Sequence, residues 1–455
     1  MRKTVFILIG LGLFSSAHAQ PQEPVHDLIH IYQLALQNDP RFRQASDVRR
    51  AALETEPKAV AQLLPLVSVT NQLNWNYLRN LKRGTFQGSG IQRYWQHNFT
   101  VNLNQPVFHW DYWVQLSQSE NQIAKAEADF QNALQDLMQR TVQAYLDVLL
   151  AKDSLRFAKA EQESLSRQLE QAQQRFDVGL IAITDVLEAQ AGFDGARSRE
   201  IVASNNLDNS IESLREIIGE YDGKLMSLQY NIPLMKPEPL DIDQWAFSAD
   251  SQNLNIIAAQ NDAEVARKTI EVQRSGHYPT VDVVGNYSVQ DNSSSFGLRG
   301  EISSVGVQVN MPIFSGGAVN SRTREATHNY NAAKDNLLAV RRQVARQVKN
   351  AYRGVLSTIS QVEALRATVK SSMSALEATT AGFEVGTRTM VDVVNEQRNL
   401  FQSQNNLAQA RNDYILNWVS LKESASSLSE EDIKVLNELL APENEDLPMT
   451  SIDGM

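Results

Sequence analysis

The stretch VNLNQPVF at residues 101–108 occurs a second time as VQVNMPIF at residues 307–314, an offset of 206 residues. The segment RFDVG at 175–179 matches GFEVG at 382–386, and Ala144-Tyr145 matches Ala351-Tyr352, both at an offset of 207 residues. Similarity at a nearly constant offset indicates one structural unit that occurs twice. The chain is therefore predicted to be a tandem duplication rather than the three domains that its length suggests.

The amino terminus resembles an export signal in composition. Arg2 and Lys3 precede an apolar run at 5–14, and Ala17-His18-Ala19 follows. These are the charged, apolar and small-residue regions of a secretory signal peptide, so cleavage is predicted before Gln20. A membrane anchor is the alternative, but about ten apolar residues are too few to cross ~30 Å of hydrocarbon.

The repeat and the signal peptide together predict five segments. They are a signal peptide at 1–19, a first repeat at 20–219, a connector at 220–250, a second repeat at 251–425, and a C-terminal segment with an acidic tail at 426–455. The connector is marked by three prolines, Pro233, Pro237 and Pro239.

The composition excludes several classes of function. The 455 residues include 42 Lys or Arg and 53 Asp or Glu, so the formal net charge is −11. No nucleic-acid partner is expected, because binding phosphates requires clustered cationic side chains. The absence of cysteine excludes disulfides, cysteine-ligated zinc, thiol nucleophiles and a lipid anchor on an N-terminal cysteine. No stretch of 18 apolar residues is present, so no membrane-spanning helix is predicted.

One long helix is predicted in each repeat. Proline is absent from 107–232 and from 313–441. In the first of these tracts apolar or small residues recur every seven positions: Ile123, Phe130, Leu137, Ala144, Ala151, Ala158, Leu165 and Ala172. Adding 207 to these numbers gives the same register in the second tract. Such heptads are typical of coiled coils. A helix over 111–178 would be about 100 Å long, so it must pack on other long helices.

A turn and a return helix are predicted after each long helix. Gly179 and Gly386 follow the heptads, and each is expected to adopt the left-handed conformation that ends a helix. The helical pattern then resumes at Thr184 and Met390. Helices at about 40–62 and 184–218 are each about half the length of the long helix, so two of them placed end to end would flank it.

Two segments of alternating polarity precede each long helix. Their apolar positions are Val67, Val69, Leu73, Trp75 and Tyr77; Phe99, Val101 and Leu103; Val281, Val283, Tyr287 and Val289; and Val305, Val307 and Val309. Alternating runs of about ten residues are typical of outer-membrane strands, which face lipid on one side and a polar lumen on the other. A soluble hairpin is the alternative for any single run, but four such runs favour the membrane. Four tryptophans at the predicted strand ends are expected to form interfacial girdles: Trp75, Trp95, Trp110 and Trp113.

The number of strands predicts the oligomer. An open sheet edge in hydrocarbon leaves backbone groups unsatisfied, and four strands cannot close a barrel. Two chains would give eight strands, with an interior filled by side chains, whereas three would give twelve and can leave a pore. The polar inner face favours the pore, so the predicted assembly is a trimer.

The sequence resembles the TolC-type outer-membrane export ducts in three stretches. These are RFDVGLIAITDV at 175–186, NLDN at 206–209 and VGTRTMVDV at 385–393. The resemblance covers nearly the whole mature chain. It implies a mainly α fold with a β-barrel: a homotrimer with a 12-stranded transmembrane barrel, four strands per chain, continued by a periplasmic α-helical coiled-coil barrel. The connector and the C-terminal segment would then lie in a mixed equatorial belt.

The resemblance also implies a function and partners. It implies an outer-membrane channel-tunnel with a large periplasmic portion, used for efflux of drugs and for type I secretion of proteins. Such a duct is passive and is opened at its periplasmic entrance by an inner-membrane pump of the RND, ABC or MFS class and a periplasmic adaptor protein.

The resemblance places an entrance gate at the helix turns. Thr184 and Asp185 on one turn and Arg388 on the other match gate-bonding positions, and Phe383 stands where the family uses a tyrosine hydroxyl. Asp392 matches the first aspartate of an entrance ring, and Asn395 replaces the second. From the residues alone, Thr184, Asp185 and Asp392 would simply be helix caps, and both roles are compatible.

Other features of the sequence predict less. His26 and His30 are four residues apart but have no third ligand and no Glu of a His-Glu-x-x-His motif, so neither a metal site nor any cofactor is predicted. No catalytic constellation is discernible, and an enzyme is not expected. The runner-up function is a trimeric envelope coiled-coil adhesin or scaffold.

One basic region stands out in the acidic chain. Residues 57–110 contain no Asp or Glu but include Lys58, Arg79, Lys82, Arg83 and Arg93. This region lies on a predicted external loop and its flanks. It indicates contact with outer-membrane lipid and with anionic lipopolysaccharide; simple solubility of the loop is the alternative.

Overall fold

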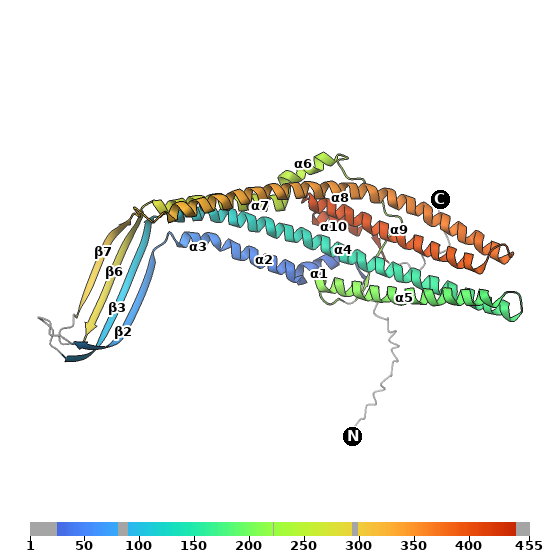
Figure 1. The fold of residues 1–455 in the computed structure, drawn as a ribbon, viewed down its shortest axis with the longest axis horizontal. Coiled ribbons are helices and arrows are strands. Elements are labelled where there is room, and N and C mark those ends of the chain that lie inside the picture. The colour runs from blue at the N-terminus through green and yellow to red at the C-terminus, as the bar shows by residue number, and fades with distance from the viewer. Residues whose placement is uncertain (1–24, 81–89, 222, 294–298, 443–455) are drawn as a thin grey trace, which may run out of the picture.

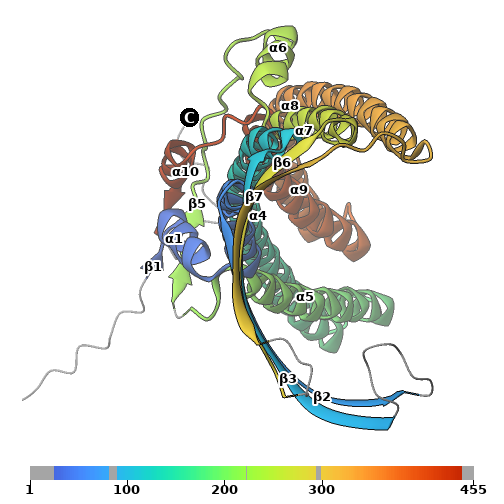
Figure 2. The same cartoon turned by 90° about the vertical axis from the view of Figure 1, so that its left-hand side faces the viewer.

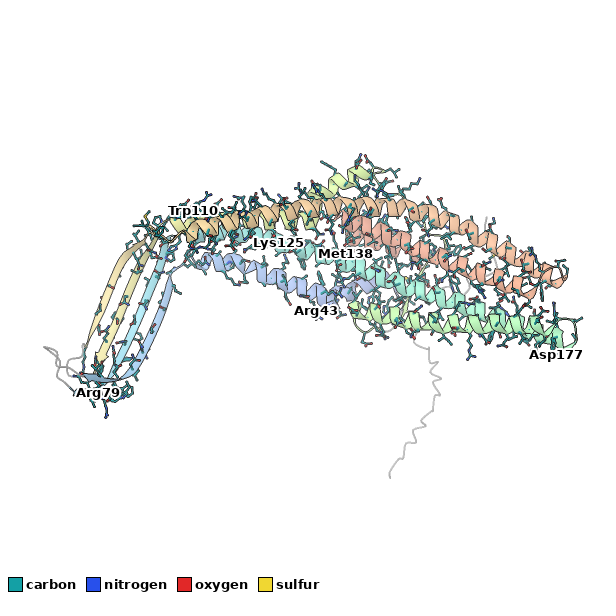
Figure 3. All side chains as sticks on the ribbon, viewed as in Figure 1. Arg43, Arg79, Trp110, Lys125, Met138 and Asp177 are labelled. Atoms are coloured by element: carbon teal, nitrogen blue, oxygen red, sulfur yellow. The ribbon has the colours of Figure 1, made fainter. Side chains whose placement is uncertain are left out.

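The computed structural model describes residues 25–80, 90–221, 223–293 and 299–442. The predicted signal peptide, Lys82, Arg83 and the end of the acidic tail lie outside these residues. Within them the chain is an elongated molecule, with a sheet at one end and the tips of two long helical hairpins at the other (Figure 1). Arg79 and Asp177 lie at these opposite ends (Figure 3).

The first half of the chain contains short helices, two strands, a long helix and a return helix. These elements are α1 (Leu28–Asn38), α2 (Pro40–Leu53), α3 (Thr55–Ala61), β2 (Leu66–Asn80), β3 (Gly90–Phe108), α4 (Trp110–Asp177) and α5 (Ile183–Ile218). The single helix predicted over 40–62 is wrong, because it is interrupted at Glu54. Pro57 has no N–H to donate to the carbonyl of residue 53, which accounts for the break.

The second half has the same order of elements. It consists of α6 (Ile242–Gln252), α7 (Leu254–Arg274), a short 3-10 helix (Ser275–His277), β6 (Thr280–Asn292), β7 (Gly300–Asn310), α8 (Ala318–Glu384) and α9 (Met390–Ser424). Helix α6 ends at Gln252 and so crosses the boundary expected between residues 250 and 251.

Small elements surround the middle of the helical part. These are β1 (Val25–His26), β4 (Lys224–Leu225), β5 (Ser227–Leu228), α10 (Glu430–Asn437) and β8 (Leu440–Ala441). Strand β1 pairs with β4, and β5 with β8. Together with α1 and α6 they lie outside the long helices (Figure 2).

The largest core lies where this middle region meets the long helices. Tyr145 of α4 and Tyr414 of α9 are almost fully buried. The Tyr145 hydroxyl donates to the carbonyl of Met226 at 2.9 Å, and the Tyr414 hydroxyl donates to that of Met235 at 3.1 Å. The connector is therefore fastened to one long helix and one return helix, one from each half.

The four long strands form one antiparallel sheet in the order β2-β3-β6-β7. They contain 15, 19, 13 and 11 residues, more than the ten or so expected. The sheet curves around one side, as seen along the long axis (Figure 2). Its outermost strands, β2 and β7, each have one edge without a partner strand in the described part of the chain.

The two faces of the sheet differ in polarity. On one face Asn286 donates to Asn102 at 2.8 Å, and the hydroxyls of Thr100 and Ser288 are 3.4 Å apart. The other face carries exposed apolar side chains, including Val67, Val69, Leu73, Val305, Val307 and Val309.

Two of the four tryptophans, Trp75 and Trp95, are placed differently from the expectation. Trp75 and Trp95 are opposite each other in the ladder, and both strands continue for five residues beyond them. They are therefore not at strand ends, because β2 and β3 extend as a two-stranded ribbon past the end of β6. Trp110 and Trp113 lie at the start of α4, at the other end of the sheet (Figure 3). All four are between 42% and 52% exposed.

In the described residues, no helix is both long enough and apolar enough to cross a membrane.

Candidate functional site at the tips of the two hairpins

The two helix turns have the same backbone conformation. Gly179 has φ of 78° and Gly386 has φ of 80°, the left-handed region that glycine adopts without strain. In the first turn the N–H of Leu180 donates to the carbonyl of Arg175 at 2.9 Å. In the second, the N–H of Thr387 donates to that of Gly382 at 2.8 Å. Both bonds are those of a Schellman motif, which ends a helix and turns the chain back.

The two predicted entrance acids cap the return helices. Asp185 accepts a hydrogen bond from the N–H of Ala182 at 3.3 Å. Asp392 accepts from the N–H and the hydroxyl of Thr389 at 2.9 and 3.0 Å. These bonds stabilise the carboxylate, so the pKa of Asp392 lies below its usual value, with Arg388 nearby as a further cause. The capping role is thus present for these two acids, whereas Thr184 lies within α5 and Ala182 occupies its N-cap position.

The remaining predicted gate residues are exposed or half-buried at the same tips. Thr184, Arg388 and Asn395 are exposed, and Phe383 is half-buried. A Cβ added to Gly382 would lie 2.8 Å from Cγ of Arg388, so the arginine stem lies directly over this glycine. Within the described chain, Asp185 and Arg388 form neither an ion pair nor a hydrogen bond with each other.

Arg175 is a tip residue that the sequence reasoning missed. Its guanidinium carbon is 5.3 Å from the centroid of the Phe383 ring, which links the first hairpin to the second by a cation–π contact. A signal was available, because the repeat has glycine at the equivalent position, Gly382. The Phe383 ring therefore joins the two hairpins although it lacks the tyrosine hydroxyl expected at this position.

An apolar cluster holds the two hairpins together near the tips. Met390 and Val394 of α9 pack with Leu165 of α4 and with small residues of α5. A Cβ added to Gly192 would lie 3.1 Å from a methyl group of Val394 and 3.7 Å from one of Leu165. Glycine at 192 thus allows α9 to approach the groove between α4 and α5 closely.

Polar contacts continue this packing along α4 and α9. Gln397 donates to the hydroxyl of Ser164 and accepts from Gln168 at 2.7 Å. Further along, Ser154 donates to Asn405 at 2.7 Å. Next to the main core, Asn412 donates to the carbonyl of Leu146 at 2.8 Å.

The histidine pair noted in the sequence lies away from the tips. The rings of His26 and His30 stack with their centroids 4.6 Å apart. Among the described residues there is no group of three or more His, Asp or Glu side chains that could hold a metal ion.

The comparisons with known proteins agree with this architecture. The sequence matches the family described as outer membrane efflux protein over residues 31–220 and 245–426. The outer membrane protein TolC of Vibrio cholerae is 35% identical over 439 residues, covering 95% of this chain and 97% of that protein. The alkaline protease secretion protein AprF of Pseudomonas aeruginosa is 28% identical, covering 90% of this chain and 86% of that protein.

A solved structure shares the fold. The outer membrane channel CmeC of Campylobacter jejuni superposes with a TM-score of 0.77 at 15% identity, covering 96% of this chain and 98% of that one. Each half of the chain is matched by the family, and the two relatives cover 95% and 90% of the chain. The chain therefore belongs to the outer membrane efflux protein family.

Proposed function

We propose that three copies of this chain form one outer-membrane duct for efflux and for type I secretion. The observation that carries the proposal is a four-stranded sheet with one polar face, one apolar face and two edges that have no partner strand among the described residues. Backbone groups left unpaired in hydrocarbon cost several kcal/mol each, so the free edges of β2 and β7 must meet partner strands. Three copies give twelve strands and a pore lined by the polar face.

The long helices extend the pore into the periplasm. Helix α4 contains 68 residues, which corresponds to about 100 Å. Three copies of α4 and α8, with their return helices, would make a cylinder that ends at the hairpin tips. The small elements around the middle of the helical part would form its equatorial belt.

The duct is passive and works with partners. The family description refers to efflux and the name of one relative to protease secretion, and both support export with partners, for which we propose an inner-membrane pump of the RND, ABC or MFS class and a periplasmic adaptor. The exported cargo would be drugs for one kind of pump and proteins for another. In this role the chain has no catalytic site of its own.

The hairpin tips form the periplasmic entrance in this proposal. Asp185 and Thr184 of one copy would pair with Arg388 of a neighbouring copy, since the exposed arginine head is free to reach outward. Threefold symmetry would place Asp392 in a ring of three carboxylates. Asn395 adds no charge to a second ring.

The outer end of the sheet is proposed to contact lipopolysaccharide. Arg79 lies near the end of β2 and Arg93 near the start of β3, beyond the Trp75–Trp95 pair. Replacing Arg79, Lys82 and Arg83 by glutamine should weaken binding to lipopolysaccharide vesicles. Unchanged binding would leave loop solubility as the role of these charges.

Single-channel recording tests the main proposal. The purified protein should be trimeric by native mass and should produce discrete conductance steps in a planar lipid bilayer. A trimer that never conducts would instead support the adhesin or scaffold.

A further inference from the structure

Three arginines from different helices lie together where the connector crosses the long helices. Arg411 of α9 donates through Nη2 to the carbonyl of Gln229, and Arg366 of α8 donates to that of Ile232 at 3.5 Å. Arg366 and Arg156 of α4 both lie close enough to Arg411 to repel its charge. The connector runs on the outer side of α4 in this region, as the position of β5 shows (Figure 2). It therefore crosses a concentration of positive charge made by these three side chains, the arginine cluster.

One carboxylate of the described residues is paired within the arginine cluster. Asp153 of α4 lies 2.9 Å from Arg156 and also attracts Arg411. Neither Arg366 nor Arg411 forms an ion pair with any residue that the structure describes. Glu363 is exposed one turn before Arg366 on the same helix but is not paired with it. Three guanidinium groups thus share a single paired carboxylate.

The arginine that lies deepest has an unused donor. Arg411 is 6% exposed, and its buried Nε has no hydrogen-bond partner among the described residues. Its guanidinium carbon lies 5.8 Å from the centroid of the Tyr230 ring. Burial lowers the pKa of Arg411 from the usual value more than the attraction of Asp153 raises it. Because arginine stays charged in proteins and an unpaired buried charge is strongly destabilising, the cluster calls for a further carboxylate or similar anion.

The residues that follow β8 carry such carboxylates. Residues 443–455, the C-terminal tail, include four Asp or Glu and no Lys or Arg. The acids are Glu443, Glu445, Asp446 and Asp453. The tail lies outside the described residues, but the point from which it starts is set by the pairing of β8.

Strand β8 starts the tail close to the arginine cluster. Its last residue, Ala441, pairs with Ser227 of β5. Two residues after Ser227 comes Gln229, whose carbonyl accepts from Arg411. Pro442 has no N–H and cannot extend the pairing, so the chain leaves the strand there. The first three acids are within five residues of Ala441 and so within about 17 Å of it.

We propose that the C-terminal tail folds back onto the arginine cluster of its own chain, where Glu443, Glu445 or Asp446 accepts hydrogen bonds from Arg366 and Arg411. Carboxylate–guanidinium pairs are strong charge-assisted hydrogen bonds. The tail is tethered beside the cluster in every copy, so its effective concentration exceeds that of a separate anion. The tail then holds the connector against α8 and α9 from the outside. This inference concerns a single chain and does not depend on the proposed trimer.

Carbodiimide coupling, which joins an amine directly to a carboxylate, tests the proposal in the full-length protein. In Arg366→Lys, the amine at position 366 should couple to an acid of the tail, and mass spectrometry of a digest should find the joined peptides. The coupled protein should remain a monomer on a denaturing gel, because tail and cluster belong to one chain.

The matched control for coupling is a second arginine of the same helix. Arg353 is exposed and lies about 20 Å from Arg366 along α8. Thirteen residues of tail can extend for up to about 45 Å, so an undocked tail also reaches this position. Arg353→Lys should nevertheless give no joined peptide, because a docked tail is held at the arginine cluster.

A spin-label measurement leaves every arginine of the cluster in place. A nitroxide attached to Leu447→Cys reacts at one position, since the chain has no cysteine of its own. Its motion should be restricted, and it should become at least about threefold faster when Arg156→Gln and Arg366→Gln are added. The matched control adds Arg346→Gln and Arg353→Gln, which remove the same charge from exposed positions of α8. The motion of the label should not change in that control.

Three results would overturn the inference. If Arg366→Lys couples to the tail no more than Arg353→Lys does, or if the label at position 447 moves equally fast with and without Arg156→Gln and Arg366→Gln, the cluster is open to an anion from outside the chain. Coupling that appears only as covalent dimers and trimers would assign the tail to a neighbouring copy. Neither measurement requires conductance, so a failure of the proposed duct would be seen separately, in the bilayer recording.

Discussion

The two helical hairpins come from one duplicated sequence but have opposite kinds of groove. In the first hairpin, Leu165 and Gly192 form an apolar groove that Val394 fills within the same chain. In the second, the equivalent positions are Ser372 and Asn399, and the groove is open. Duplication therefore preserved the backbone and let the two grooves diverge, one apolar and filled within the chain, the other polar and open.

The largest test of this difference is to truncate the same position in both hairpins. Leu165 is 1% exposed, so Leu165→Ala leaves a cavity and should destabilise the helical part by about 2–5 kcal/mol. Ser372→Ala should change stability by less than about 0.5 kcal/mol. Thermal unfolding followed by circular dichroism in detergent measures both. Equal losses would mean that the two grooves are equivalent in energy.

Two glycines of α5 provide the next test. A Cβ at Gly192 meets Val394 at 3.1 Å, whereas one at Gly195 meets only the end of the Arg199 side chain at 3.5 Å. Both alanine variants gain up to about 1 kcal/mol of helix propensity, but Gly192→Ala also overpacks the groove, at a cost of about 1–3 kcal/mol. Gly195→Ala should therefore raise the melting temperature and Gly192→Ala should not. A rise in both would show that α9 can move away without loss.

The acids at the hairpin tips can be tested by measuring how strongly multivalent cations block the conductance. With Asn395 in place of a second acid, we expect multivalent cations to block conductance more weakly than in Asn395→Asp. One added carboxylate per copy should tighten block about tenfold, as roughly 1.4 kcal/mol of added attraction would. Because Thr389 holds the pKa of Asp392 below its usual value, block should persist at pH 5. Titration of the conductance with a trivalent cation measures the strength of block. Equal block in the unmodified protein and in Asn395→Asp would contradict a single ring of carboxylates at Asp392.

A last test, of similar size, concerns a glutamate that occurs in both halves, at the far end of the return helices. Burial, followed by the nearby Asp136, raises the pKa of Glu423 to about 7. The folded state therefore binds this proton more tightly than the unfolded chain, and stability falls as pH rises from about 4.5 toward 7. Glu423→Gln should stabilise the protein by about 1–2 kcal/mol at pH 8 and have little effect at pH 4.

The counterpart of Glu423 is the control for that prediction. Glu216 is exposed and lies 3.5 Å from Arg41. Glu216→Gln should shift stability by less than about 0.5 kcal/mol at either pH. Unfolding temperatures measured at pH 4 and pH 8 decide the matter, and a gain at pH 8 in both variants would argue against burial as the cause.

Much of the fold could be read from local patterns. The heptads at Leu137, Leu165 and Ala172 coincide with buried positions of α4. The left-handed glycines Gly179 and Gly386 lie where the chain turns. The positions of Trp75 and Trp95 could not be read in this way, because the end of the four-stranded part of the sheet depends on where β6 stops.

The candidate site was only partly accessible from the sequence. The positions of Asp185 and Asp392 at the tips follow from the repeat offset. The stacking of Arg175 on Phe383 does not, because it depends on how far α4 and α8 extend relative to each other.

The sequence alone determined the duplication, the coiled-coil register, the alternation of the strands and the turns, because each of these is a local pattern of polarity and backbone freedom. Only the tertiary structure decided which copy of a repeated face is covered. Leu187 and Val394 occupy the same position in the same pattern, yet one is exposed and the other buried. Burial depends on which helix lies alongside, and within one chain only α9 has α4 beside this face.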